Sequence, residues 1–212
     1  MNTHLRPGLC LLLLLAASAV HAQRAPAPAE FYFDDDARVA VPLVAIPGEG
    51  DEVHGRLLQL IDRNGRNVDV ARAQLARALM RSGREETGRA MYAQVLAALP
   101  ARAPLRSSVH WNYGWDLSRA GHADEAVAQW VLALEGRLVK PAWAPPTLAL
   151  GLWRMGRRDE AVQWYAAAVR TEPQRWSDPA QFQALLPDWT DAERATLRDV
   201  HAAWFANQPA WP

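Results

Sequence analysis

The sequence predicts an all-α protein built as a solenoid of stacked helix pairs, with an extended N-terminal segment and a C-terminal capping helix. The main observation is a repeat, because residues 114–130 return 35 residues later as residues 149–165. The glycine Gly121 recurs as Gly156, and each is followed by an Asp-Glu-Ala-Val motif. A fixed offset of this size is typical of repeat architectures. The second observation is helical periodicity from Asp51 to the end of the chain.

Composition limits the classes of partner. The chain has 212 residues, enough for one domain with its own core, and its 23 basic and 23 acidic side chains balance. A net charge near zero gives no bias toward nucleic acid or an anionic membrane, so we expect no nucleic-acid partner.

Residues 1–22 are predicted to be a signal peptide. Arg6 precedes an apolar run over residues 9–17, and Val20-His21-Ala22 is a small-x-small cleavage site. The run is shorter than the roughly 20 residues of a membrane span, so we expect no span after cleavage; an uncleaved anchor is the alternative. Cleavage also removes Cys10, the only cysteine, and leaves 22 basic against 23 acidic groups. The expected location is the bacterial periplasm, with secretion as the alternative.

Residues 23–49 are predicted to be a Pro/Ala linker followed by an extended segment laid along the body, because prolines and β-branched residues disfavour a helix. The run Asp34–Asp36 lacks the alternating spacing of a calcium loop, and a solvated acidic loop is the better interpretation. Residues 50–67 are predicted to hold one helix of a half-repeat.

Residues 68–176 hold three copies of one pattern, over residues 69–102, 107–140 and 142–175. In each copy a glycine marks the turn between two helices, a small residue follows five positions later, and an aromatic residue follows four further on. These positions are Gly83, Gly88 and Tyr92; Gly121, Ala126 and Trp130; and Gly156, Ala161 and Tyr165. Small residues at these positions allow two helices to approach closely, and the aromatic residue fills the space beside them. Tryptophan at helical spacing is usually a core residue, and we expect this of Trp130, Trp164 and Trp204.

This pattern resembles the tetratricopeptide repeat, whose signature is W-x₂-L-G-x₂-Y…A-x₃-F…P. The leading tryptophan is replaced by Arg72, His110 and Pro145, leucine stands at the tyrosine site, and the closing proline is present as Pro100 and Pro173. The resemblance implies a tetratricopeptide-type solenoid whose concave groove, lined by the first helix of each pair, binds an extended peptide or a partner helix.

Residues 177–212 are predicted to be a helical cap that closes the end of the stack. A short helix over residues 179–186 is ended by Pro187, and Thr190 with Glu193 forms a capping box that opens a helix to about Asn207.

Mapping the resemblance residue by residue places large aromatic and cationic side chains in the groove, the types that dominate binding hot spots. Four arginines could also seat a carboxylate. Core packing for the tryptophans and solvation for the arginines are the alternatives. The lysines of a well-known carboxylate-clamp groove are missing, so that specificity is not expected. The candidate groove residues are Arg77, Arg81, Trp111, Asn112, Trp115, Arg119, Trp143, Trp153 and Arg154.

The expected function is that of a periplasmic scaffold that binds a protein or peptide of the cell envelope. The alternatives are a small-ligand or glycan binder that uses Trp111, Trp115 and Trp153, or an unrecognised envelope enzyme. The histidines show no metal-ligand spacing, and the sequence contains no phosphate loop or nucleophile elbow. We therefore expect no cofactor, no metal and no catalytic residues. The partner and the oligomeric state are not specified by the sequence.

Overall fold

The structure is a computed structural model that describes residues 25–29, 31–33 and 38–210. The predicted signal peptide, with Cys10, and the Asp34–Asp36 run lie outside these residues.

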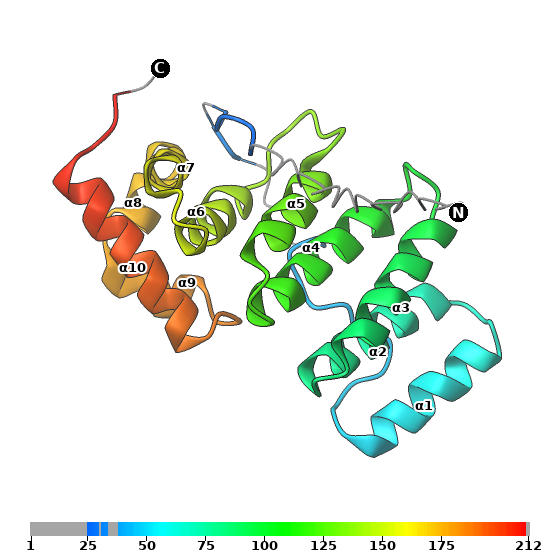
Figure 1. The fold of residues 1–212 in the computed structure, drawn as a ribbon. Helices are drawn as coiled ribbons and strands as arrows, with labels where there is room; N and C mark the ends of the chain where they lie inside the picture. The colour runs from blue at the N-terminus through cyan, green and yellow to red at the C-terminus, as the bar shows by residue number, and fades with distance from the viewer. Residues whose placement is uncertain (1–24, 30, 34–37, 211–212) are drawn as a thin grey trace, which may run out of the picture.

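The described residues form helices without any strand, and the helices pack in consecutive pairs, α2 with α3, α4 with α5 and α6 with α7. The pairs follow one another in an arc from α1 to α10 (Figure 1). The predicted all-α solenoid of helix pairs is therefore confirmed. The helices are α1 (Asp51–Asp62), α2 (Val68–Arg81), α3 (Glu85–Ala98), α4 (Pro104–Arg119), α5 (Ala123–Leu134), α6 (Ala144–Arg154), α7 (Arg158–Thr171), α8 (Pro173–Trp176), the 3₁₀ helix η1 (Pro179–Gln181), α9 (Phe182–Leu185) and α10 (Asp191–Ala206).

The turns inside the three pairs share one backbone geometry. Each turn glycine has a positive φ, between 77° and 96°, which a glycine adopts without steric cost. The residue after each glycine donates its N–H to a leucine carbonyl in the last turn of the first helix, 2.9 Å away in every pair, as in a Schellman motif. The accepting leucines are Leu79, Leu117 and Leu152.

The size of one residue in the first helix matches the aromatic residue that faces it. A Cβ atom added at Gly114 would lie 2.4 Å from Nε1 of Trp130, so only glycine fits beside that ring. The corresponding positions of the other two pairs hold Ala76 and Ala149, where the aromatic residues are the smaller Tyr92 and Tyr165. Glycine with tryptophan and alanine with tyrosine fill similar space.

Most of the core is one continuous cluster that runs through all three pairs and into the C-terminal cap. Trp130, Trp164 and Trp204 are buried in it, as predicted. A second, smaller cluster joins α1 to α2 through Leu57 and Leu75. None of the helices in the described ranges combines the length and the hydropathy that crossing a bilayer requires.

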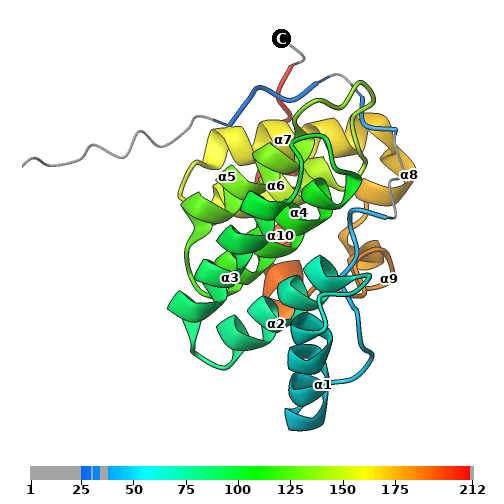
Figure 2. The ribbon, with the colours of Figure 1, turned by 90° about the vertical axis from the view of Figure 1, so that its right-hand side faces the viewer.

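The C-terminal cap covers the last pair. The capping box predicted at Thr190 and Glu193 is present, and α10 packs against α6 and α7. The short helix predicted over residues 179–186 is divided into η1 and α9. The N-terminal segment runs from α7, where the N–H of Tyr32 donates to the hydroxyl of Thr171, past Asn112 of α4 and Gln74 of α2 to α1 (Figure 2).

Candidate functional site

The first helices α2, α4 and α6 form a face on which the protein's own N-terminal segment lies. The amide of Asn112 accepts a hydrogen bond from the N–H of Leu43 at 3.1 Å and donates to the carbonyl of Val41 at 3.0 Å. The amide of Gln74 accepts from the N–H of Ile46 at 3.0 Å and donates to its carbonyl at 2.7 Å. Each of these two side-chain amides thus both accepts from and donates to the backbone of the segment, and Oε1 of Gln74 also accepts from the N–H of Ala45 at 2.7 Å.

Gln74 and Asn112 occupy the same position in successive repeats, nine residues before the turn glycine of each pair. The third member of this series is Thr147 in α6. Its hydroxyl donates to the carbonyl of Trp143 in the preceding turn at 2.7 Å, and none of the described residues of the segment bonds to it. We call these three positions the amide row. Gln74 and Asn112 form hydrogen bonds with the backbone of the segment, whereas Thr147 does not.

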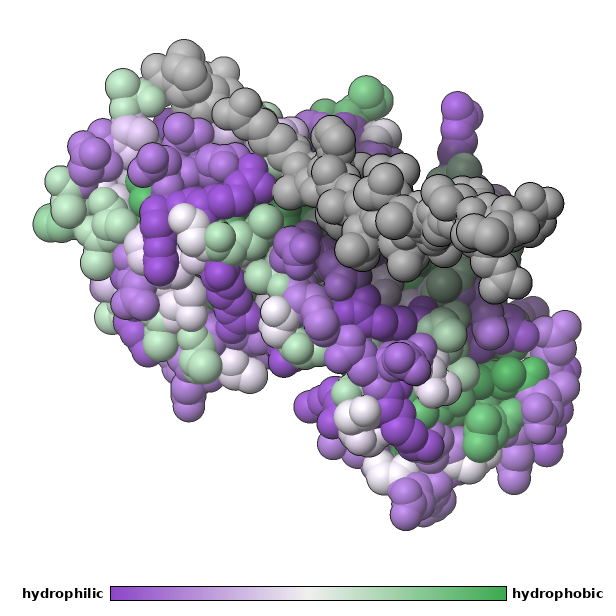
Figure 3. Space-filling view, in the orientation of Figure 1, coloured by the Kyte–Doolittle hydropathy of each residue, from purple (hydrophilic) through white to green (hydrophobic). Residues whose placement is uncertain are grey.

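Next to Thr147 the face opens into a cavity of about 400 Å³. The molecule is notched between the end formed by α1 and the end formed by α8–α10, and mainly polar side chains surround the notch (Figure 3). The cavity is bounded by α2, α4 and α6, by the segment at Pro42, and by the loop from α9 to α10 at Trp189. Its volume lies in the range of small-ligand sites.

Most of the candidate groove residues line this one cavity. They are Arg77, Arg81, Trp111, Asn112, Trp115, Arg119 and Trp143. Trp153 and Arg154 do not. Trp153 lies beneath the guanidinium of Arg158, 3.7 Å from its ring centroid, and Arg154 donates to the hydroxyl of Ser118 at 2.7 Å. Both residues are the last two of α6, just before the turn that leads to α7.

Tryptophan side chains form one wall of the cavity. The Trp115 ring meets the rings of Trp111 and Trp189 edge to face, with centroids 5.9 and 4.9 Å apart. Trp143 lines the cavity from the start of α6. The indole N–H groups of Trp111, Trp115 and Trp143 are buried and have no hydrogen-bond partner among the described residues. Buried indole N–H groups usually find a partner, so three neighbouring exceptions distinguish this wall.

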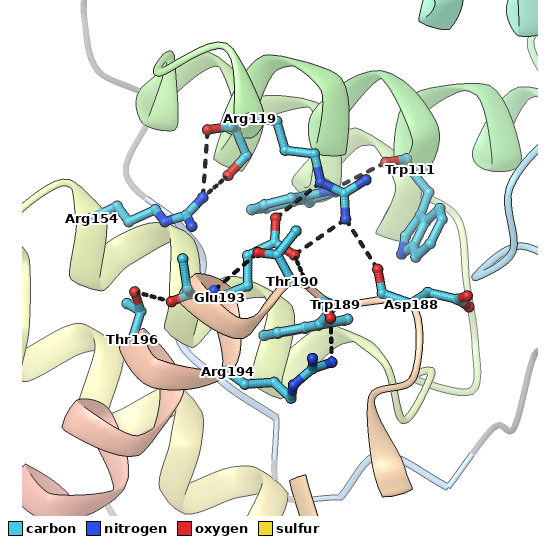
Figure 4. A network of polar contacts seen from close by, with 12 residues as sticks. Trp111, Arg119, Arg154, Asp188, Trp189, Thr190, Glu193, Arg194 and Thr196 are labelled. Carbon is cyan, nitrogen blue, oxygen red and sulfur yellow. Dashed lines mark hydrogen bonds and ion pairs between the residues drawn. The ribbon is translucent and has the colours of Figure 1, made fainter. Parts of the chain in front are cut away.

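The arginines at the end of each first helix are already paired. Arg81, Arg119 and Arg154 are equivalent residues, and Arg81 donates to Glu49 at 3.0 Å on the surface. Arg119 donates to both carboxylate oxygens of Glu193, at 2.9 and 3.2 Å, and to the carbonyl of Asp188 (Figure 4). Three of the four arginines that the sequence suggested as a seat for a carboxylate are therefore already engaged by other residues.

The ion pair between Arg119 and Glu193 joins α4 to the cap. Glu193 is 1% exposed, and burial alone raises the pKa of a carboxyl group. Hydrogen bonds from Arg119 and from the backbone N–H of Thr190 outweigh this effect, so the pKa of Glu193 is below its ordinary value. Arg119 also lies 5.1 Å from the centroid of the Trp115 ring. One side chain thus holds the tryptophan wall to the C-terminal cap.

Asp116 places a buried carboxyl group at the cavity. The hydroxyl of Tyr92 donates to its Oδ2 at 2.6 Å, and burial raises the pKa of Asp116 to about 6. The other oxygen, Oδ1, makes no hydrogen bond with a described residue. Arg77 is half-buried near this carboxyl and also makes no hydrogen bond or ion pair with a described residue. Arg77 and Oδ1 of Asp116 thus join the three indole N–H groups as buried or half-buried polar groups of the lining that the described residues leave unengaged.

The charges of the whole lining balance. Its arginines are Arg77, Arg81, Arg119 and Arg175, and its carboxylates are Glu49, Asp116, Glu172 and Asp188. Within the described ranges, no three histidine, cysteine, aspartate or glutamate side chains gather as metal ligands.

Four residues of the site were missed from the sequence. Gln74 could have been found, because it is the repeat equivalent of Asn112, which was selected. Asp116 could also have been noticed as a charged residue on the inner side of α4. Trp189 and Glu193 come from the cap, and no sequence signal places the cap against the groove. Comparison with protein-family models, with curated proteins and with solved structures finds no match.

Proposed function

We propose that this chain is an exported interaction module of the tetratricopeptide type, which binds an extended segment of a partner protein of the cell envelope on the face formed by α2, α4 and α6. The amino-terminal sequence supports export to the periplasm. The repeat pattern and the helix pairs support the fold type. The face carries two side-chain amides that both donate to and accept from the backbone of the N-terminal segment.

The observation that carries this proposal is the bound N-terminal segment. Residues 41–46 have no regular secondary structure of their own, yet their backbone is paired by Gln74 and Asn112. A peptide that adds to such a row gains main-chain hydrogen bonds whatever its sequence, and specificity comes from the side-chain pockets. A partner segment of similar form can bind in the same way, in place of the protein's own segment.

The test uses the full chain with a protease site inserted between Gly48 and Gly50, which lie just before α1. Cleavage leaves the segment bound without a covalent link. A fluorescent peptide of residues 38–47 should then exchange with it and give saturable binding by anisotropy. The uncut protein should bind the peptide much more weakly, because its tethered segment competes at high effective concentration.

Variants of the amide row make this test specific. Gln74→Leu and Asn112→Leu should each weaken peptide binding about tenfold or more, because each removes two or more hydrogen bonds. Thr147→Val is the matched control, since it changes the equivalent residue without touching the segment, and it should bind as the parent does. A cleaved protein that does not bind the peptide, or that binds it equally after both leucine substitutions, would contradict the proposal.

Export and the partner are tested in cells. Intact mass of the purified protein should begin at Gln23 if residues 1–22 are removed on export. A photo-crosslinking amino acid at position 77 should trap one envelope protein, and Asn112→Leu should abolish that adduct. A chain that retains Met1 in the cytosol would contradict the proposed location.

A further inference from the structure

The cavity beside Thr147 differs from the part of the face that holds the segment. At this point the amide row ends, because Thr147 uses its hydroxyl within its own helix. The side-chain amide of Asn112 also lines the cavity, but it is already bonded to the segment, so the cavity has no free side-chain amide to pair with a peptide backbone. Its occupant must be recognised by the tryptophan wall and by the unengaged polar groups, Arg77 and Asp116.

We infer that this cavity is a binding site for a neutral saccharide, with the tryptophan wall as the stacking surface and Arg77 and Asp116 as partners for ring hydroxyls. The proposal goes beyond peptide binding and uses different residues of the face. It rests on three properties of the lining: its flat aromatic area, its unpaired donors and acceptor, and its balanced charge.

The tryptophan wall suits a ligand with flat, weakly polar faces. The C–H face of a pyranose ring packs on an indole ring, and its hydroxyl groups point outward from the ring edge, where they donate and accept hydrogen bonds. Trp143 is partly exposed at the cavity and offers such a face, and Trp111 and Trp115 are largely buried in the wall beside it. All three carry buried N–H groups that have no hydrogen-bond partner among the described residues. A small movement of an indole ring on binding would let a hydroxyl oxygen accept from one of these groups.

The unengaged polar groups select against other ligand classes. An apolar ligand would bury Arg77 and the free Oδ1 of Asp116 without partners, which is costly for charged groups. An anion would meet Asp116, and a cation would meet Arg77. A hydroxyl group satisfies both residues, because it donates to a carboxylate and accepts from a guanidinium. A saccharide presents such groups side by side, and the balanced charge of the lining adds no preference for an ion.

The cavity also has a suitable size and position. About 400 Å³ accommodates one or two sugar rings. The segment at Pro42 and the loop at Trp189 both line it, and the notch in the surface gives a longer chain a way out (Figure 3).

The experiment is calorimetric titration of the full-length protein with three neutral disaccharides, cellobiose, maltose and N,N′-diacetylchitobiose. Glucuronate and the peptide of residues 38–47 represent the two alternative ligand classes, an anionic sugar and a peptide. Cosedimentation with purified peptidoglycan distinguishes a wall polymer from a free sugar. We expect saturable binding of at least one neutral saccharide, with a change in tryptophan emission, and no comparable binding of glucuronate or of the peptide at this cavity.

Paired tryptophan variants locate the site. Trp143→Ala should weaken saccharide binding at least tenfold, whereas Trp153→Ala, which removes a tryptophan of the same helix region outside the cavity, should change it less than twofold. Arg77→Met removes only an unengaged group and should also weaken binding, which keeps the test valid if Trp143→Ala unfolds by circular dichroism. Absence of binding to all three disaccharides and to peptidoglycan, equal binding by the Trp143 and Trp153 variants, or preference for the peptide would overturn the inference.

Discussion

The face formed by the first helices α2, α4 and α6 has one helical framework, but one part of it holds the N-terminal segment and another part is an open cavity. The protein's own segment is bonded to α2 and α4, and a cavity with a tryptophan wall opens beside α6 and is also lined by residues of α2 and α4. We call these the filled half and the open half. The difference follows from one position per repeat. Gln74 and Asn112 pair with a backbone, whereas the shorter Thr147 bonds to its own helix. A repeat framework can therefore change what it binds by single substitutions along one row.

The two halves also differ in the burial of the ion pair that the equivalent arginine forms in each. At the filled half, Arg81 pairs with Glu49, and both side chains are largely exposed, by 58% and 83%. At the open half, the equivalent Arg119 is 35% exposed and pairs with Glu193, which is almost completely buried. The cap is fixed to the open half through this pair, so stability and the shape of the cavity are linked there.

The largest expected effect is therefore that of Arg119→Ala. The substitution leaves the buried carboxylate of Glu193 without its cation, and we expect the free energy of unfolding to fall by about 3 kcal/mol. Urea denaturation followed by circular dichroism measures the change. Arg175→Ala is the control, since it removes an exposed pair with Glu172 and should cost less than about 1 kcal/mol. Equal effects of the two substitutions would show that the cap does not depend on the buried pair.

The next effect concerns the contact between Gly114 and Trp130, which lies behind the tryptophan wall because the Trp130 ring packs against Trp115. Gly114→Ala places a methyl group against Trp130, and we expect a loss of about 1 to 3 kcal/mol from overpacking. Trp130→Tyr should recover part of this loss, because the other two pairs combine alanine with tyrosine at these positions. A double-mutant cycle by thermal or urea unfolding gives the coupling. Strict additivity of the two substitutions would mean that the Trp130 ring is not the reason why residue 114 must be glycine.

A smaller, pH-dependent effect is expected from Asp116. Its pKa of about 6 lies above the ordinary value of 3.8, so the folded state binds a proton that the unfolded state releases. The resulting stability is complete below pH 3.8 and is lost as pH rises through 6, which amounts to about 1 kcal/mol between pH 5 and pH 7. Asp116→Asn should remove this component, so the difference between the two proteins should grow in favour of the variant over that interval. A difference that stays constant with pH would show that Asp116 is ionised throughout.

The repeat made much of the fold predictable from the sequence. The turn glycines, the leucines that close the turns and the small residues beside the aromatic residues all recur at fixed offsets, and a local pattern that recurs is readable without an alignment. The capping box at Thr190 was predictable for a different reason, because it depends only on residues within one helical turn.

The site was less predictable, because its decisive contacts join segments far apart in the chain. The contact of Asn112 with Val41 spans 71 residues, and that of Arg119 with Glu193 spans 74. The pattern selected Arg119 as a groove arginine but carried no information on the acid that pairs with it. The same holds for Trp153 and Arg154, which fit the spacing of the groove but contact Arg158 and Ser118 outside the cavity.

The smallest effect is expected from Arg81→Ala, the equivalent of the first substitution on the filled half. The pair with Glu49 is exposed to solvent, which screens the attraction, and both side chains are long and mobile when unpaired. We expect a change in unfolding free energy below about 0.5 kcal/mol, measured in the same urea experiment as Arg119→Ala. The segment is held there by the amide of Gln74 and not by charge, so peptide exchange in the cleaved protein should also be unchanged. If Arg81→Ala instead destabilised the protein as much as Arg119→Ala, the turn before α1 would depend on this pair, and the two halves would be closed by ion pairs of equal importance.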